Sequence, residues 1–578
     1  MYVTLISPIS DSIPPQFQKL SFYGREDLAT GSIVPIVFNN RPMHGIVLQS
    51  APLQNLKQSI KSSPFTIKKL DLTPETIIPP SHQSEFILKI ADITLQNPGK
   101  LYFNFFGEKY PSTSQDLETF PKTKTQNLHV LACELNRSAL VEKIKITKPD
   151  IIICASSGMC ELWRTLTDVV HIITPAQLPL FLIEHGHDFS TLSVAIIDVS
   201  DNRYTQSQRA PYLDYREIII PALQCLGTGQ IKLDLYDTYI DTMVLSIFQL
   251  SPQQIMRSTQ LITPLATEHT RDTRYLDTMF TRESFEHIKN TVNSGGIVHI
   301  ITGRKGLASS ISCSNCAYIA RCPECHHVQS LVSRRKSGER LFHCHQCQTK
   351  SPVYDHCPEC QGLLTLLGYT TVSIADSLKN LRAFQDIPII IIDSNTTKNF
   401  KKLTKQYSQV KNGGIVVTTP GFETYMDTPH LCLIVSLEGL LSGPAYNQDS
   451  IIYRYLRSID SPTVIQIRSV PIDEKLTADT TTYTTDEKSI FTTYGLPPYM
   501  AHITLTKIIK SGDMSHESIF IHSLIKQFTD LSHRETRAIP SKNRTVMVSH
   551  TLSYLPSYHT EFIKNILPQL TGYSIRKI

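Results

Sequence analysis

The sequence has no long apolar run and little excess charge. No window reaches about 18 consecutive apolar residues, so we expect no segment that crosses a membrane. The N-terminus, MYVTLISPIS, has neither a basic segment nor the apolar core of a signal peptide. A formal net charge of +5 over 578 residues is mildly basic, which allows nucleic-acid binding without requiring it. These absences predict a cytoplasmic protein.

Cysteine, in contrast, is plentiful for a cytoplasmic chain. Thirteen cysteines in that compartment point to metal ligands or free thiols, because disulfides are rare there. Eight of them lie within 48 residues as four Cys-x-x-Cys pairs: Cys313/Cys316, Cys322/Cys325, Cys344/Cys347 and Cys357/Cys360. Each such turn aims two thiolates at one ion, and two turns complete a tetrahedron. The sequence therefore predicts two Zn²⁺ ions per chain, both structural because four thiolates leave no position for a reacting water.

The spacing of the pairs leaves two pairings open. The inner pairs are separated by the 18 residues between Cys325 and Cys344, the usual spacing of a zinc ribbon. That pairing leaves Cys313/Cys316 to close with Cys357/Cys360 around the outside, and we prefer this nested arrangement. A sequential pairing is the alternative. Redox Cys-x-x-Cys motifs fit less well, because they normally occur once in a chain.

Hydrophobic patterning predicts two lobes of α/β structure behind a small β-rich N-terminal domain. The runs 31–38 and 45–48 predict strands of that domain, and a helix is expected over 84–95. Short continuous apolar runs then recur on both sides of the cysteine-rich segment, as expected for buried parallel strands: 129–132, 151–154, 194–197, 297–301, 387–393, 415–417 and 431–435. The threonine-rich stretch 477–485 predicts a flexible connection.

Several short motifs, taken in order, resemble the primosomal protein N′ (PriA) family of bacterial replication-restart helicases. The segment 300–308 (IITGRKGLA) precedes the cysteine pairs as a similar strand and turn do in that family. Further matches are Asn97-Pro-Gly-Lys-Leu101, Asp393-Ser-Asn-Thr-Thr397 and Leu496-Pro-Pro-Tyr499. Each is weak alone, whereas their order and spacing are specific and run nearly from end to end. The resemblance also implies the nested zinc pairing.

The resemblance implies a multidomain α/β architecture. It consists of a β-rich 3′ DNA-binding domain, two degenerate RecA-like lobes, an insert with two four-cysteine zinc sites and an α+β C-terminal domain. The expected divisions are 1–107 (DNA-binding domain), 108–127 (linker), 128–305 (first lobe and connecting segment), 306–365 (zinc insert), 366–472 (second lobe) and 473–578 (C-terminal domain).

The sequence departs from the family where a motor needs its chemistry. A phosphate-binding loop combines a glycine-rich backbone, a lysine and Ser/Thr, but the segment Cys133–Ser138 has no glycine and no lysine. In the acid motif Asp198-Val-Ser-Asp201, Val199 stands where a glutamate should orient water, and valine accepts no proton. Only Thr419 matches the family's motif in the segment 418–424, and the arginine-rich motif expected after 453–457 is absent.

These departures predict a pseudo-helicase with no catalytic residues and without ATP as a cofactor. We interpret the remaining arginines of the segment 453–457, Arg454 and Arg457, as solvated helix residues. The remaining function is then recognition of DNA forks and recruitment of other primosome and replication proteins. A divergent but active ATP-dependent 3′–5′ helicase and a zinc-stabilised scaffold without DNA binding are the alternatives. Candidate DNA-contacting residues are Phe17, Lys19, Arg304, Lys305, Arg334, Arg335 and Lys336.

Overall fold

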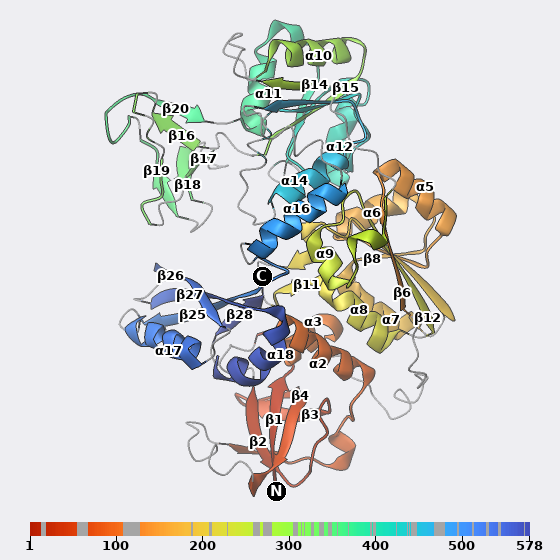
Figure 1. Ribbon diagram of the computed structural model, residues 1–578, viewed down its shortest axis with the longest axis vertical. Coiled ribbons are helices and arrows are strands. Elements are labelled where there is room, and N and C mark those ends of the chain that lie inside the picture. The colour runs from red at the N-terminus through yellow and green to blue at the C-terminus, as the bar shows by residue number, and fades with distance from the viewer. Residues whose placement is uncertain are drawn as a thin grey trace.

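The computed structural model of the chain divides into four bodies of secondary structure and a cysteine-rich insert (Figure 1). The N-terminal sheet and the C-terminal domain lie at one end, the two α/β lobes follow, and the insert projects beside the second lobe. The structure describes residues 1–12, 19–54, 67–107, 128–186, 189–206, 211–227, 229–257, 266–269, 280–303, 310–313, 315–316, 318, 320–324, 329–333, 340–344, 349–354, 356–367, 369–393, 396, 400–422, 425–435, 437, 440, 448–467, 480–493, 496–510, 514–527, 531–540, 545–570 and 573–577.

The N-terminal body is a five-stranded sheet with two helices against it. Its strand order is β3-β4-β1-β2-β5, and its core includes the buried residues Ile33, Ile46 and Phe86. The strands and the helix expected in this region are confirmed. The elements are β1 (Tyr2–Pro8), β2 (Leu20–Gly24), β3 (Ile33–Phe38), β4 (Arg41–Pro52), β5 (Lys68–Lys69), α2 (His82–Thr94) and α3 (Pro98–Phe106).

The first lobe is a six-stranded sheet of order β13-β6-β12-β9-β7-β8 in which every pairing is parallel. Its middle strands are apolar because helices cover both faces. The strands are β6 (Leu128–Glu134), β7 (Ile151–Ile153), β8 (His171–Ile173), β9 (Thr191–Ile197), β12 (Gln230–Asp237) and β13 (Ile255–Arg257), with the hairpin β10 (Thr205–Gln206) and β11 (Leu213–Asp214). The helices are α5 (Arg137–Thr147), α6 (Ser157–Leu166), α7 (Leu178–His185), α8 (Tyr215–Leu226) and α9 (Thr242–Ile247).

The second lobe is also a six-stranded parallel sheet, of order β14-β24-β23-β15-β22-β21. The chain leaves this sheet after β15 to form the cysteine-rich insert and returns to it at β21. The strands are β14 (Ala266–His269), β15 (Ile297–Ile301), β21 (Ile389–Ile392), β22 (Gly414–Thr418), β23 (Leu431–Ile434) and β24 (Thr463–Ile467). The helices are α10 (Arg282–Asn293), α11 (Thr371–Lys379), α12 (Phe400–Tyr407) and α14 (Gln448–Arg457).

The insert consists of two small antiparallel sheets. One pairs β16 (Ser310–Cys313) with β20 (Leu364–Leu367), so the ends of the insert meet. The other has the order β17-β18-β19 and comprises β17 (Ser330–Ser333), β18 (Arg340–His343) and β19 (Lys350–Pro352). Among the described residues of the insert, the buried side chains of Ala320, Leu331 and Phe342 pack into one core.

The C-terminal body is a four-stranded antiparallel sheet of order β26-β27-β25-β28. Its helices are α16, which precedes the sheet, α17 and the short α18. The elements are α16 (Thr480–Thr493), β25 (Ala501–Lys510), α17 (Met514–Gln527), β26 (Ser532–Pro540), β27 (Thr545–Tyr554), α18 (His559–Glu561) and β28 (Ser574–Lys577).

The prediction of a flexible connection over 477–485 is wrong from Thr480 onward. These residues begin α16, and one face of the helix is anchored despite its polar composition. Tyr483 stacks on Tyr453 of α14 with ring centroids 4.0 Å apart, and Glu487 and Phe491 are buried one and two turns later. Three large side chains at four-residue spacing suffice to hold a threonine-rich helix against the lobes.

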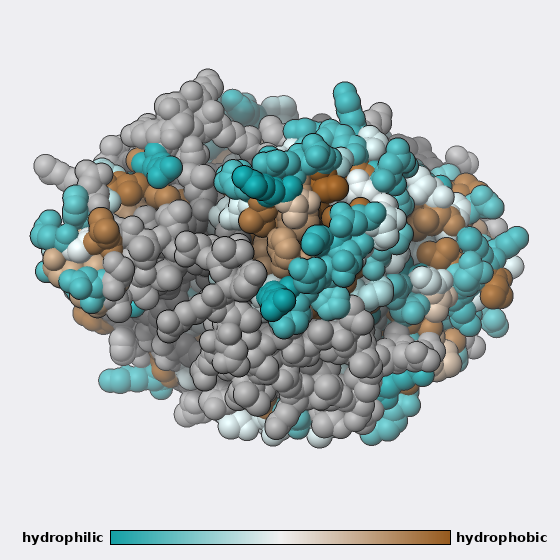
Figure 2. Space-filling model, turned by 90° about the horizontal axis from the view of Figure 1, so that it is seen from above, coloured by the Kyte–Doolittle hydropathy of each residue, from teal (hydrophilic) through white to brown (hydrophobic). Residues whose placement is uncertain are grey.

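Most of the residues coloured in Figure 2, which views the end that carries the second lobe, are hydrophilic. Figure 2 also shows smaller hydrophobic patches there. Within the described ranges, no helix combines the length and the apolar composition that crossing a bilayer requires.

Candidate functional site

Three carboxylates meet where two neighbouring strands of the first lobe end. Asp198 directly follows β9, and Asp237 is the last residue of β12, which pairs with β9 in parallel. Asp201 lies in the turn after Asp198 and caps the next short helix. Because parallel strands end at the same edge of a sheet, these acids share the side on which α/β proteins bind ligands.

The guanidinium group of Arg454 occupies this acid cluster. Arg454 belongs to α14 of the second lobe, and its Nε lies 2.6 Å from Oδ1 of Asp237. Its Nη2 lies 3.2 Å from Oδ1 of Asp198, and its Nη1 lies 3.7 Å from Oδ2 of Asp201. Arg457, one turn later, is 6% exposed and donates from Nε to the carbonyl of Thr238 at 3.2 Å. The interpretation of both arginines as solvated is therefore wrong, because each is held in the interface between the lobes.

The environment shifts the titration of these groups in opposite directions. Burial raises the pKa of Asp237 to about 7, and Asp198 adds to that shift, while Arg454 opposes it. Burial alone raises the pKa of Asp201 as well, but Arg203 and Arg454 bring it down to about 2. The pKa of Arg454 is raised by the same carboxylates against the effect of burial. The short contact between Nε and Oδ1 is typical of a charge-assisted bond, so we treat the Arg454–Asp237 pair as ionised at neutral pH.

The connection between β6 and α5 is too short to wrap a phosphate. Strand β6 ends at Glu134 and α5 begins at Arg137, which leaves Leu135 and Asn136 between them. A phosphate-binding loop of the Walker type needs several more residues between strand and helix. Glu134 is buried and accepts a hydrogen bond from the backbone N–H of Ile240 at 3.1 Å, so its side chain points into the lobe.

The first turn of α5 already has an anionic partner. The carboxylate of Asp460, which follows α14, accepts hydrogen bonds from the backbone N–H of Ser138 at 3.4 Å and from its hydroxyl at 3.2 Å. The start of a helix attracts negative charge through its free N–H groups. A side chain of the second lobe therefore lies where an anionic ligand of the first lobe would bind.

A small cavity lies between the lobes beside these contacts. Its volume is about 80 Å³, and Trp163, Asp198, Asp237, His299 and Asp460 are among the residues that line it. Pockets for drug-sized ligands measure roughly 300–1,000 Å³, so this space is too small for a nucleotide. His299 is buried on the second-lobe side, and burial lowers its pKa to about 3, so its ring is neutral at physiological pH.

Val199 cannot take part in proton transfer. It is fully buried in the core of the first lobe, and its backbone N–H donates to the carbonyl of Tyr236 at 3.2 Å. Its side chain therefore faces the core of the lobe.

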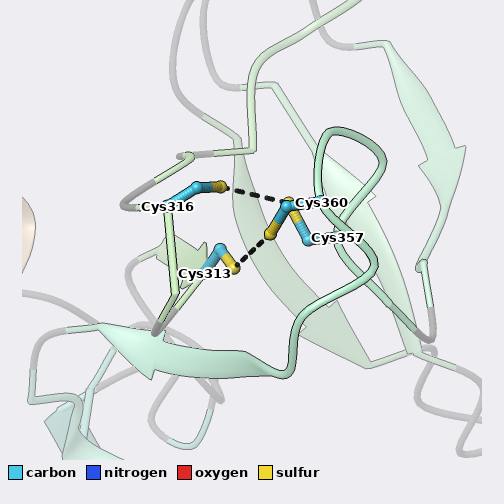
Figure 3. A group of neighbouring side chains, drawn as sticks. All are labelled: Cys313, Cys316, Cys357 and Cys360. Carbon is cyan, nitrogen blue, oxygen red and sulfur yellow. Dashed lines mark hydrogen bonds between the residues drawn. The ribbon is translucent and has the colours of Figure 1, made fainter.

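The outer four cysteines of the insert form a cluster. All four thiol sulfurs, of Cys313, Cys316, Cys357 and Cys360, lie within 4.8 Å of one another (Figure 3). The sulfurs of Cys313 and Cys360 are 3.4 Å apart, and those of Cys316 and Cys357 are 3.6 Å apart. The strand pair β16–β20 brings the two Cys-x-x-Cys turns together, since Cys313 ends β16 opposite Leu364. The outer half of the nested arrangement is therefore present.

The geometry of this cluster fits a zinc ion. Zn–S bonds of about 2.3 Å in a tetrahedron place the sulfurs about 3.8 Å apart, close to the observed separations. A disulfide needs about 2.05 Å, so the thiols are not bonded to one another. The backbone N–H of Asn315 donates to Sγ of Cys313 at 3.3 Å, a contact that stabilises a thiolate ligand.

The inner four cysteines are described only in part. Cys322 and Cys344 are both buried, and Cys344 follows the last residue of β18. Cys325 and Cys347 lie outside the described residues, so the second zinc site stays a prediction.

Of the predicted DNA-contacting residues, only Lys19 is described. It lies just before β2 and is exposed, although the loss of solvent around its ammonium group lowers its pKa and Asp92 of α2 opposes that shift. The remaining candidates, Phe17, Arg304, Lys305, Arg334, Arg335 and Lys336, lie outside the described residues.

No family model matches the sequence, but curated relatives do. The chain is 27% identical over 268 residues to the replication restart protein PriA of Chlamydia trachomatis, a match that covers 43% of this chain and 34% of that protein. It is 22% identical over 426 residues to the PriA protein of Rickettsia felis, covering 71% and 60%. The match to the PriA protein of Thermotoga maritima is 24% identical over 255 residues, 42% of this chain and 34% of that protein. In the first of these matches the chain spans about a third of the relative's length.

The solved structures that match this chain do so with low TM-scores and little shared sequence. A Dbp5 variant from S. cerevisiae bound to RNA and ADP BeF3 has a TM-score of 0.33 and 10% identity, covering 67% of this chain and 91% of that one. The helicase MrfA bound to DNA and AMPPNP has a TM-score of 0.27 and 12% identity, covering 81% and 56%.

Proposed function

We infer that this chain, a divergent relative of the replication restart protein PriA, binds DNA forks and recruits replication proteins without hydrolysing ATP. The observation that carries the proposal is the placement of Arg454 among Asp198, Asp201 and Asp237. In ATP-driven motors a carboxylate at this edge of the sheet holds Mg²⁺, and the metal neutralises the charge that develops on the phosphates. An arginine held by the same carboxylates competes directly with that metal.

The connection between β6 and α5, where a motor would bind the phosphates of ATP, also supports a chain that does not hydrolyse ATP. ATP hydrolysis by this class of protein depends on positioning and charge stabilisation, which a glycine-rich loop and its lysine supply. Here the strand reaches α5 after only Leu135 and Asn136, and Asp460 is bound to Ser138 at the start of the helix. A triphosphate would have to displace that carboxylate and would meet no lysine in the connection. Val199 replaces the residue that would order the attacking water.

Binding of DNA is proposed from the relatives and from the distribution of charge. The curated relatives are replication restart proteins by name, and the chain carries a net charge of +5. The run Arg334-Arg335-Lys336 of the insert is the densest group of cations among the candidates. In this proposal two structural zinc ions hold the insert, these three cations contact phosphates or a partner protein, and the lobes serve as a scaffold.

The test combines two measurements on the purified full chain. ATP hydrolysis is followed with and without fork DNA, alongside a known DNA-dependent ATPase and an Asp198→Ala variant of this chain. We expect the wild type and Asp198→Ala to give the same background rate. DNA-stimulated hydrolysis that Asp198→Ala abolishes would contradict the proposal and favour a divergent active helicase.

Fork binding is measured by fluorescence anisotropy across a salt series. Each phosphate contact steepens the fall of log affinity with log salt by about 0.9. Replacing Arg334, Arg335 and Lys336 together by alanine is expected to weaken binding and to flatten the slope. An Arg382→Ala variant, which removes one exposed cation of the second lobe, serves as the control. The absence of salt-dependent binding would point to a scaffold that acts without DNA.

A further inference from the structure

We propose that Arg454 and Asp460 hold the two lobes closed without nucleotide, as built-in counterparts of the metal cation and the phosphate. Both residues come from the second lobe, one from α14 and one from the turn after it, and both contact the ligand-binding edge of the first lobe. The inference rests on the proposed function, because bound Mg-ATP and these side chains would compete for the same groups. It adds that the closed arrangement is permanent and independent of nucleotide.

The cation side of this interlobe contact is made by one guanidinium group with three acids. Every nitrogen of the Arg454 guanidinium faces a carboxylate: Nε faces Asp237, Nη2 faces Asp198 and Nη1 faces Asp201. The side chain of Asp237 is 0% exposed and that of Arg454 is 17% exposed, so solvent screens the pair weakly. The backbone carbonyl of Arg454 also accepts a hydrogen bond from the hydroxyl of Thr238 at 3.1 Å, which fixes α14 against the end of β12.

The contact between Asp460 and Ser138 is weaker than that of Arg454, but it also holds the two lobes together. Asp460 reaches the second residue of α5, an 11-residue helix whose N-cap Asn136 already satisfies the N–H of Ala139. The Asp460 carboxylate then satisfies the N–H of Ser138. Both Ser138 and Asp460 are exposed, so this contact contributes as a screened, helix-terminal charge interaction.

A third contact joins the lobes on the other side of Arg454. The hydroxyl of Tyr425, in the second lobe, accepts a hydrogen bond from Nη1 of Arg203 at 2.6 Å and lies 3.4 Å from the hydroxyl of Ser156. Arg203 in turn forms an ion pair with Asp201 at 2.6 Å, so the Tyr425 contact and the Arg454 contact share one carboxylate. Asp198, Asp237 and Asp460 from the first two contacts line the cavity of about 80 Å³, which is too small for a nucleotide.

Removal of the guanidinium group leaves the first lobe with an uncompensated charge cluster. Asp198, Asp201 and Asp237 would then face one another, and among the described residues Arg203 would remain paired with Asp201. Breaking a buried ion pair by deleting one partner is strongly unfavourable for the state that contains it. The lobes of an Arg454→Ala variant should therefore separate so that water can reach these carboxylates.

The experiment is hydrogen–deuterium exchange with mass spectrometry on the full chain, supported by small-angle scattering. Peptides that cover 198–206 and 448–457 report the contact between the lobes. In the wild type we expect the same exchange rates and radius of gyration with and without excess Mg-ATP. In Arg454→Ala we expect exchange in both peptides to accelerate at least tenfold, with a larger radius of gyration. Asp460→Ala should accelerate exchange about two- to fivefold, and Arg382→Ala, on the exposed surface of the second lobe, should leave it unchanged.

The outcomes separate this inference from the proposed function. Unchanged exchange in Arg454→Ala and Asp460→Ala, or faster or slower exchange in the wild type on addition of Mg-ATP, would overturn the inference. ATP hydrolysis is measured on the same samples. If the wild type does not hydrolyse ATP and neither variant changes the exchange rates, the inference is overturned and the proposed function stands. Hydrolysis by the wild type overturns the proposed function whatever the exchange data show. Asp460 is exposed, so its substitution keeps the test valid if Arg454→Ala does not fold.

Discussion

Replacing Cys357 by serine tests whether the cysteine cluster holds the insert together. Cys357 is fully buried, and its sulfur lies 3.6 Å from that of Cys316 across the cluster. The serine hydroxyl is not ionised at neutral pH and is a poor zinc ligand. The substitution therefore leaves three thiolates in a site built for four. The backbone of the turn does not depend on the sulfur, because the N–H of Cys357 donates to the carbonyl of Gly362 at 3.0 Å.

The expected loss can be worked out from the ligand count. Structural zinc sites contribute roughly 10–16 kcal/mol of apparent binding free energy. One ligand of four then corresponds to on the order of 3 kcal/mol, or about a hundredfold in zinc affinity. Because Cys313 ends β16, which pairs with β20, a weakened site should also loosen that strand pair.

Zinc content and zinc release provide the assay. Elemental analysis of the wild type is expected to give two zinc ions per chain, and Cys357→Ser is expected to retain one after dialysis against a mild chelator. The control is Cys225→Ser, which removes a half-buried thiol of α8 in the first lobe. Wild-type protein without zinc, or Cys357→Ser with unchanged zinc content and release rate, would refute the reasoning. A wild type with one zinc that Cys357→Ser removes would support the outer site and refute the inner one.

Two further perturbations test the packing of other regions. In Gly99→Ala the new Cβ would meet the backbone oxygen of Pro8 at 2.0 Å, so we expect the N-terminal body to lose about 3 kcal/mol, seen as faster hydrogen exchange over 98–106. His299 has a pKa of about 3 because burial disfavours its charged form, whereas an unfolded histidine titrates near 6.5. The stability that its neutral ring provides is present above pH 6.5 and is lost as the pH falls from 6.5 toward 3. The loss is about 1.4 kcal/mol per pH unit, and His299→Gln should remove this dependence from thermal unfolding curves.

Matched substitutions control for both effects. Lys100→Ala, next to Gly99, removes an ammonium group 3.9 Å from the exposed Asp11 and should leave exchange over 98–106 nearly unchanged. If Gly99→Ala behaves like Lys100→Ala, the close approach of Pro8 is not real. His287→Gln, on α10 of the same lobe as His299, should keep the wild-type pH dependence. An identical pH profile for wild type and His299→Gln would show that the ring is not buried in solution.

The sheets were predictable because their strands are buried on both faces. Runs such as 151–154, 194–197 and 431–435 contain little but aliphatic residues, which leaves few structures other than the middle of a parallel sheet. The outer cysteine cluster was predictable for a different reason, since the spacing of the ligands is itself the signal. Helix α16 was missed, because its anchoring residues contact partners in α14 and the first lobe that no local pattern reveals.

The interlobe contact was missed because it pairs residues that are far apart in the chain. Arg454 and Asp237 are 217 residues apart, and nothing within α14 distinguishes Arg454 from a solvated helix arginine. One signal was available. Asp198 directly follows the strand expected over 194–197, and a carboxylate at the end of a buried strand needs a cation, although the strand that ends at Asp237 was not among those expected. Once no lysine was found near β6, an arginine from the other lobe was the natural candidate.

The bonds between the two ends of the fold constrain the order in which the protein assembles. Gln96 donates to the carbonyl of Ile575, His559 bonds to the carbonyl of Asp92, and Lys577 donates to the carbonyl of Ile93, over separations of 467 to 484 residues. At a synthesis rate of about 5–20 residues per second, the end of α2 waits roughly 25 to 100 s on the ribosome for these partners. During that time the N-terminal body must therefore be kept folded by its own core. The surface that later contacts the C-terminal sheet stays accessible to chaperones.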